Sequence, residues 1–136
     1  MVKRFLIYLS FSIVLLSCQD DDIIHVPPQL VVEGWIDADG FPIVILTTTV
    51  PINDDKQSVA TLDEYMVKWA KVTISDGEQE AVLIGKVNND YFPPYIYTTS
   101  HMRGVPGKNY KLVVEYKDFY AKAVATIPYK VNIDSF

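Results

Sequence analysis

The stretch Gly107-Lys108-Asn109-Tyr110-Lys111-Leu112-Val113-Val114 decides the fold of this chain. From residue 110 to residue 117, one set of alternate positions is wholly apolar and the other is mostly charged. A period of two is typical of a β-strand with one buried face. We therefore predict a strand that begins at Tyr110, with the tyrosine ring in the core and Lys111 in solvent.

The remaining sequence predicts further short strands, separated by residues that favour turns. They are expected at residues 30–37, 43–50, 70–75, 81–87, 91–99 and 120–127, with one short helical turn at 61–66. A glycine shortly before a strand that opens with tyrosine is typical of sandwiches in which the tyrosine hydroxyl binds nearby backbone. The fold prediction is all-β: an immunoglobulin-like or prealbumin-like β-sandwich of about seven strands, after a signal peptide that is cleaved.

The first 17 residues have the pattern of a secretory signal peptide. Lys3 and Arg4 precede an apolar run of about a dozen residues, whereas a membrane-spanning helix needs about 20. The next stretch, Leu15-Leu16-Ser17-Cys18, resembles a bacterial lipobox, whose cysteine becomes the acylated first residue of the mature protein. Because Cys18 is the only cysteine, it has no intramolecular disulfide partner, and lipidation is favoured over a free thiol.

Three acidic residues, Asp20, Asp21 and Asp22, follow the cysteine almost directly. Such a run resembles the surface-export signal of Bacteroidota outer-membrane lipoproteins, and the alternative is a solvated spacer. The expected organisation is a signal peptide at 1–17, a lipidated acidic and proline-rich tether at 18–29, the sandwich at 30–128, and a tail at 129–136 where a second region would begin. The expected location is the outer membrane, lipid-anchored and facing the exterior.

Charge and composition restrict the partners. Without the leader, which carries Lys3 and Arg4, 119 residues remain with 10 basic and 17 acidic side chains, a net charge of −7. An acidic surface argues against nucleic acid and against electrostatic adhesion to anionic lipid. We therefore expect the membrane to be contacted through the lipid anchor alone.

Four segments carry a resemblance to one family: Leu30-Val31-Val32-Glu33-Gly34-Trp35-Ile36, Ala70-Lys71-Val72-Thr73-Ile74-Ser75-Asp76-Gly77, residues 107–114, and Ala125-Thr126-Ile127-Pro128. Their order is similar to that in domain-of-unknown-function family 4249, lipoproteins of Bacteroidota. The resemblance implies a place in the cell envelope and supplies no catalytic residues. Members are usually longer, so a truncated product or gene fragment is one alternative.

Aromatic strand residues are the candidate ligand contacts. Trp35 shares a predicted strand face with Glu33, and Tyr95 and Tyr97 fall in another aromatic strand. Such residues either form a platform for a sugar or peptide or pack across strands. His25 and His101, the only histidines, lack a nucleophile at a recognisable spacing. We expect no enzyme activity, no metal and no cofactor.

The predicted function is a binding or scaffold role on the outer-membrane surface, accessory to nutrient import. The candidate partner is an outer-membrane receptor or another cell-envelope protein, and the glycan or peptide ligand is not specified by the sequence. The alternatives are an adhesin-like or structural protein-interaction domain, or a non-functional fragment of a longer lipoprotein.

Overall fold

The computed structural model describes residues 27–49 and 61–131. This part of the chain is all-β, as predicted, with seven strands and one short 3₁₀ helix. They are β1 (Leu30–Trp35), β2 (Ile43–Thr48), η1 (Thr61–Tyr65), β3 (Lys71–Ser75), β4 (Glu80–Val87), β5 (Tyr95–Thr98), β6 (Asn109–Tyr116) and β7 (Phe119–Thr126). The helix η1 lies where the capping-box spacing predicted a helical turn.

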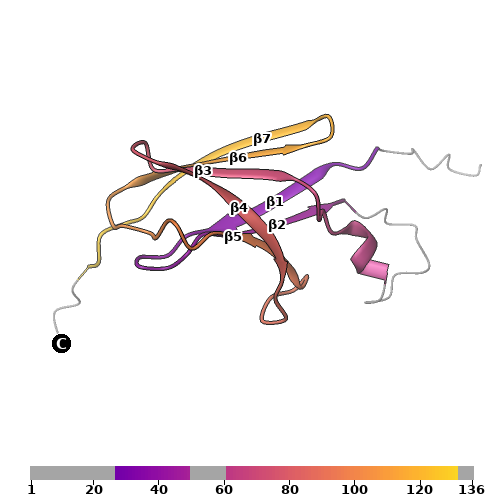
Figure 1. Ribbon diagram of the computed structural model, residues 1–136, viewed down its shortest axis with the longest axis horizontal. Helices are drawn as coiled ribbons and strands as arrows, with labels where there is room; N and C mark the ends of the chain where they lie inside the picture. Colours follow the sequence, from indigo (N-terminus) through magenta and orange to yellow (C-terminus); the bar gives the residue numbers. More distant parts are fainter. Residues whose placement is uncertain (1–26, 50–60, 132–136) are drawn as a thin grey trace, which may run out of the picture.

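The seven strands form one nearly closed antiparallel sheet in the order β1-β2-β5-β4-β3-β6-β7. The strand β4 joins its two halves. Its first half pairs with β3, where Leu83 lies opposite Val72, and its second half pairs with β5, where Gly85 lies opposite Tyr97. Figure 1 shows β4 running obliquely from β3 towards β5. The predicted two-layer packing is therefore made by folding one sheet over itself.

The hairpins follow the predicted turns. In β1 and β2, Leu30 pairs with Thr48 and Trp35 with Ile43, around a turn in which the Gly40 nitrogen donates to the Asp37 carbonyl. The β3–β4 turn contains Gly77 at φ 92°, a conformation that glycine adopts without steric cost. Pairing between β3 and β6, in contrast, joins residues such as Lys71 and Glu115 that are far apart in the sequence.

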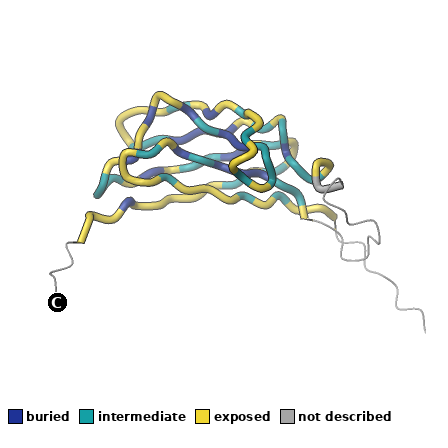
Figure 2. Tube along the Cα trace, turned by 90° about the horizontal axis from the view of Figure 1, so that it is seen from below, coloured by how far each residue is buried: buried dark blue, intermediate teal, exposed yellow. Residues whose placement is uncertain are grey.

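The core lies between the two halves of the folded sheet. Val72 and Val114 are completely buried, Leu46 is 1% exposed, and Tyr110 is 3% exposed. Figure 2 shows burial concentrated on the inner strands, whereas β7, which leads to the C-terminal end, is exposed along most of its length. Tyr110 and Val114 lie inward while Lys111 is exposed, so the predicted alternation is confirmed.

The strand β5 differs most from its predicted range, whereas β1 and β2 each end two residues before their predicted ends. Backbone pairing of β5 begins at Tyr95 rather than at residue 91, because the residues before it form turns around Pro93 and Pro94. Proline has no backbone N–H to donate to a sheet. In the described ranges, no helix is long and apolar enough to cross a membrane.

Candidate binding surfaces

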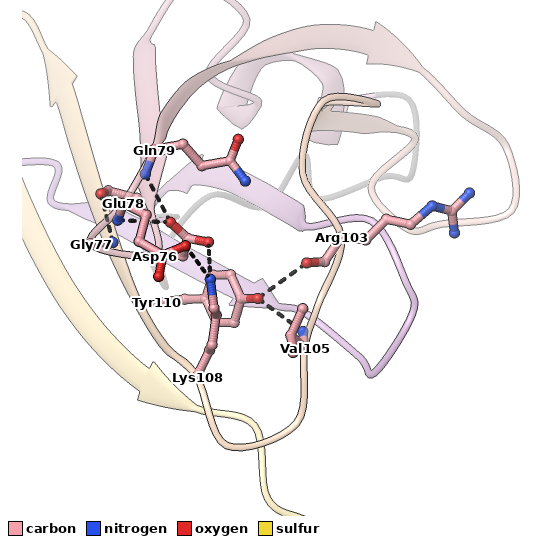
Figure 3. Close-up of polar contacts among 9 residues, drawn as sticks. Asp76, Gly77, Glu78, Gln79, Arg103, Val105, Lys108 and Tyr110 are labelled. Carbon is pink, nitrogen blue, oxygen red and sulfur yellow. Dashed lines mark hydrogen bonds and ion pairs between the residues drawn. The ribbon is translucent and has the colours of Figure 1, made fainter.

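The strand β6 is held at its start by the hydroxyl of Tyr110. This hydroxyl donates to the Arg103 carbonyl at 3.1 Å and accepts from the Val105 nitrogen at 2.9 Å (Figure 3). A buried phenol needs such partners, because an unsatisfied buried hydroxyl costs free energy. The bonds tie the loop before β6 to the core, as the Gly-to-Tyr pattern predicted.

An ion-pair cluster fixes the adjacent β3–β4 turn. Lys108 Nζ lies 3.0 Å from Asp76 Oδ2 and 2.9 Å from Glu78 Oε2 (Figure 3). The other Asp76 oxygen accepts from the backbone nitrogens of Glu78 and Gln79. These backbone bonds and Lys108 hold the pKa of Asp76 well below its usual value, and the two carboxylates raise the pKa of Lys108. The cluster is a structural clamp between the turn and the start of β6.

Tyr95 and Tyr97 lie on the inner side of the sheet. Tyr97 is 2% exposed, and its hydroxyl donates to the Val67 carbonyl at 2.8 Å and accepts from the Ala70 nitrogen. Burial raises the pKa of Tyr97. The half-buried Tyr95 packs edge-on against Tyr97 and donates to the Lys68 carbonyl. Both tyrosines therefore pack in the core and across strands, and they do not form a platform for a sugar or peptide.

Trp35 lies on the opposite face. Glu33 and Trp35 alternate with the inward residues Val32 and Gly34 of β1, Glu33 is exposed, and Trp35 is 37% exposed. The Trp35 ring contacts Tyr91 with centroids 5.8 Å apart. We call Glu33, Trp35 and Tyr91 the Trp35 surface. Since Tyr95 and Tyr97 point inward, the structure does not join them to Trp35 in one platform.

The face that carries Trp35 is partly covered, which the strand pattern did not predict. Ile45 pairs with Glu33 and therefore faces outward with Trp35, yet it is only 5% exposed. Ile96, which alternates with the inward Tyr95 and Tyr97, is 1% exposed. The Trp35–Tyr91 contact places the segment between β4 and β5 against this face. The uninterrupted apolar run of β2 was the available signal, since such runs are typical of strands buried on both faces.

A groove lies in the seam where the sheet does not close, at the C-terminal ends of β1 and β7. It has a volume of about 260 Å³ and is lined by residues of β1 and β2, including Gly34 and Val44, and by residues of β6 and β7, including Leu112, Ala123 and Ala125. We call it the edge groove. Its two rims are the outer edges of β1 and β7, the end strands of the sheet.

Small side chains create the edge groove. Ala121, Ala123 and Ala125 alternate on the inner side of β7, and Ala123 and Ala125 are exposed although they face the core side. On the β1 rim, Gly34 has no side chain, and a Cβ at this position would contact the side chains of Val44 and Leu112. The floor includes the buried residues Val44 and Ile74. The result is an apolar surface with two strand edges, a combination typical of peptide or strand docking.

The predicted anchor and export residues Cys18, Asp20, Asp21 and Asp22 lie outside the described residues, as does His25. His101 is exposed in the loop after β5. Within residues 27–49 and 61–131, no group of three or more histidine, cysteine, aspartate or glutamate side chains is placed to hold a metal ion.

The fold and surfaces define a small all-β domain made of one folded antiparallel sheet with an open apolar seam. A family model described as "Domain of unknown function (DUF4249)" matches residues 19–136, and the chain belongs to this family. No curated protein and no solved structure matches the sequence.

Proposed function

We propose that this protein is a lipid-anchored outer-membrane lipoprotein of Bacteroidota type, whose β-domain acts as a binding or scaffold module at the cell surface. The observation that carries the proposal is the sequence Leu15-Leu16-Ser17-Cys18 after a short basic and apolar leader. A single acyl chain gives marginal membrane binding, whereas two or more anchor a protein stably. The acidic run after Cys18 supports export to the outer face.

The domain supports a role in recognition. It carries a Trp35 surface in which a partly exposed indole lies beside an exposed carboxylate, and aromatic rings are favoured for contacts with sugars and peptides. The ligand class proposed is a glycan or peptide that reaches the cell surface, and the proposed partner is an outer-membrane import receptor. A net negative charge of the mature chain favours partners with basic surfaces.

A second candidate function is an adhesin-like protein-interaction domain. The outward side of β4 carries Val82 and Ile84, which are 57% and 71% exposed. Neighbouring exposed apolar residues on a strand are typical of protein contacts rather than of sugar contacts. Binding of a protein that is lost in Ile84→Lys and kept in Trp35→Ala would favour this second function.

Replacement of Cys18 tests the anchor. Cys18→Ser removes the thiol that would be acylated, so the chain should keep its leader or leave the outer-membrane fraction, and it should lose incorporation of labelled palmitate. Ser17→Ala keeps a small residue before the cysteine and should behave as the parent. A Cys18→Ser chain that is cleaved normally and stays in the outer membrane would refute the anchor.

Replacement of the acids tests surface display separately. Changing Asp20, Asp21 and Asp22 to alanine should leave palmitate labelling intact and reduce digestion of the domain by protease added to whole cells. Changing them to glutamate keeps the charge and should preserve exposure. If the parent and the alanine variant are digested equally, the three aspartates act only as a spacer and not as an export signal.

A further inference from the structure

The edge groove has the geometry of an acceptor for one more strand. The sheet is antiparallel throughout, so its end strands β1 and β7 run in the same direction. A strand antiparallel to both would bond to both rims and close an eight-stranded sheet. In the part of the chain that the structure describes, neither outer rim has a backbone partner. Unpaired strand edges beside an apolar surface favour strand addition.

The lining of the groove defines what such a strand must supply. Ala123 and Ala125 on the β7 rim are small and exposed, which leaves room beside them for larger side chains. The floor is apolar, so the occupant should present apolar residues at alternate positions, because alternate side chains of a strand point to the same face. Its other face would meet solvent and should be polar.

The C-terminal segment 129–136 has this pattern. Tyr129, Val131 and Ile133 alternate with Lys130, Asn132 and Asp134. Tyr129 and Val131 are 75% and 81% exposed, so these apolar side chains have little packing in their own domain. The chemistry of the segment therefore matches the edge groove.

The path of the chain directs this segment away from its own groove. The Ile127 nitrogen and carbonyl still bond to Lys108 and Gly107, which continues the β6–β7 pairing. The Tyr129 ring lies against Gly107, on the β6 side of β7 rather than on the β1 side. Figure 1 shows the described chain after β7 continuing past the end of the sheet without turning back.

We propose that the edge groove binds segment 129–136 of a second copy of this chain, so that two copies exchange their C-terminal strands and form a closed dimer. Val131 and Ile133 of one copy enter the groove of the other, opposite Ala125 and Ala123. Each exchanged strand bonds to the rims of β1 and β7. Reciprocal exchange of one element is a low-cost route to a symmetric dimer. The inference does not depend on the lipid anchor.

Disulfide trapping tests the exchange in the full chain with Cys18→Ser, which removes the only native thiol. Directly opposed residues of antiparallel strands have Cα atoms about 4.5–5.5 Å apart, and disulfides form at about 4.4–6.8 Å. Ala123→Cys with Ile133→Cys should therefore give, under mild oxidation, a covalent dimer as the main product. The matched control, Ala123→Cys with Asn132→Cys, places the second thiol on the opposite face and should give little.

Other results would overturn the proposal. Monomers without reactive thiols would mean that the segment returns to its own groove. Persistent free thiols would mean that the segment does not reach the groove at all. Equal linkage in test and control pairs would mean random collision, and a ladder of higher multiples would exclude the reciprocal dimer.

Mass in solution gives a test without added thiols. By light scattering the Cys18→Ser chain should have twice its monomer mass, and Ile133→Asp should return it to the monomer mass by placing a charge in the apolar groove. Asp134→Ala, on the solvent face, should keep the dimer. A monomeric parent chain, or a dimer unchanged by Ile133→Asp, would refute the exchange.

Discussion

The hydroxyl of Tyr110 lies 2.9 Å from the backbone nitrogen of Val105, five residues earlier, and it also donates to the Arg103 carbonyl. One side chain thus fills the core with its ring and satisfies two backbone groups of a loop with its hydroxyl. The loop from Arg103 to Val105 is in turn bonded through Gly104 to the β1–β2 turn. Through this loop, Tyr110 connects the start of β6 with the β1–β2 turn.

Replacing Tyr110 should destabilise the domain in two separable steps. Tyr110→Phe removes both hydroxyl bonds and should lower the free energy of unfolding by about 1–3 kcal/mol. Tyr110→Ala removes the ring as well and should cost about 3–5 kcal/mol. The exposed neighbour Lys111→Ala should stay within about 0.5 kcal/mol of the parent. Denaturant melts measure all three, and equal midpoints for Tyr110→Ala and Lys111→Ala would contradict the structure.

Gly104 should tolerate no larger residue. A Cβ there would overlap the Asp37 carbonyl oxygen and the Ile127 side chain, and it would disturb the bonds from Asp39 N to Gly104 O and from Gly104 N to Gly40 O. Gly104→Ala should lower the free energy of unfolding by about 2–5 kcal/mol through overpacking and lost hydrogen bonds.

The control for this variant is Gly77→Ala. A Cβ at Gly77 meets no atom within 4 Å, so the variant isolates the cost of positive φ, about 1–2 kcal/mol. If thermal or denaturant melts show that Gly104→Ala is more stable than Gly77→Ala, the close contact between Gly104 and the β1–β2 turn is contradicted.

The cluster of Asp76 and Lys108 predicts a specific pH dependence. The pKa of Asp76 is lowered in the folded state, so its contribution is present above the unfolded value of about 3.9 and is lost as the pH falls below it. The pKa of Lys108 is raised, so its contribution is present below about 10.4 and is lost as the pH rises beyond that value. The contribution of the clamp to the free energy of unfolding should be constant between these two pH values.

Melts of Asp76→Asn from neutral to acidic pH measure this effect. The variant should be less stable than the parent at neutral pH, and the difference should shrink as the pH falls below about 4, where the parent carboxylate is protonated too. Asp118→Asn, in the exposed β6–β7 turn, should follow the parent at every pH. A difference for Asp76→Asn that stays constant down to strong acid would contradict the clamp.

The Trp35 surface predicts which tryptophan contacts a ligand. On an array of glycans and peptides, Trp35→Ala should lose binding by about tenfold or more, the effect of removing roughly 1.4 kcal/mol of contact. Trp69→Ala changes the more exposed tryptophan, which is 88% exposed and is not on β1, and it should bind as the parent does. Equal losses in both variants, or none in either, would remove Trp35 from the proposed site.

Local pattern predicted most of the strands because each is a short run of alternating or β-branched apolar residues between residues that favour turns. Tyr110, Leu112 and Val114 identified β6 and its inward face, and Asp76-Gly77 identified a hairpin turn. The strand order could not be read in this way, since pairing such as Val72 with Val114 depends on which distant edges meet. Nor did the pattern indicate that the last half of β4 would leave β3 and pair with β5.

Side-chain roles were predicted less well than strands. Tyr97 and Trp35 both belong to aromatic strands, and only the three-dimensional pairing shows that the first faces Val67 inside the core while the second faces Tyr91 outside. The edge groove escaped prediction because its cause is the smallness of Ala123, Ala125 and Gly34. Alanines in a strand have a low β-propensity and give no signal of the space that they leave.

The strand β4 has a consequence for how the domain comes apart. The strand β4 belongs to both halves of the sheet, because its first residues pair with β3, its last residues pair with β5, and Leu83 packs in the common core. If one half of the sheet opens, the strands of the other half therefore lose hydrogen-bond and packing partners. We expect cooperative, all-or-none unfolding, with backbone amides of β4 among the slowest to exchange with solvent. During synthesis, β3 gains its second partner, β6, only some 35 residues after its own end, so the five strands before the last hairpin become part of a complete sheet only when that hairpin arrives.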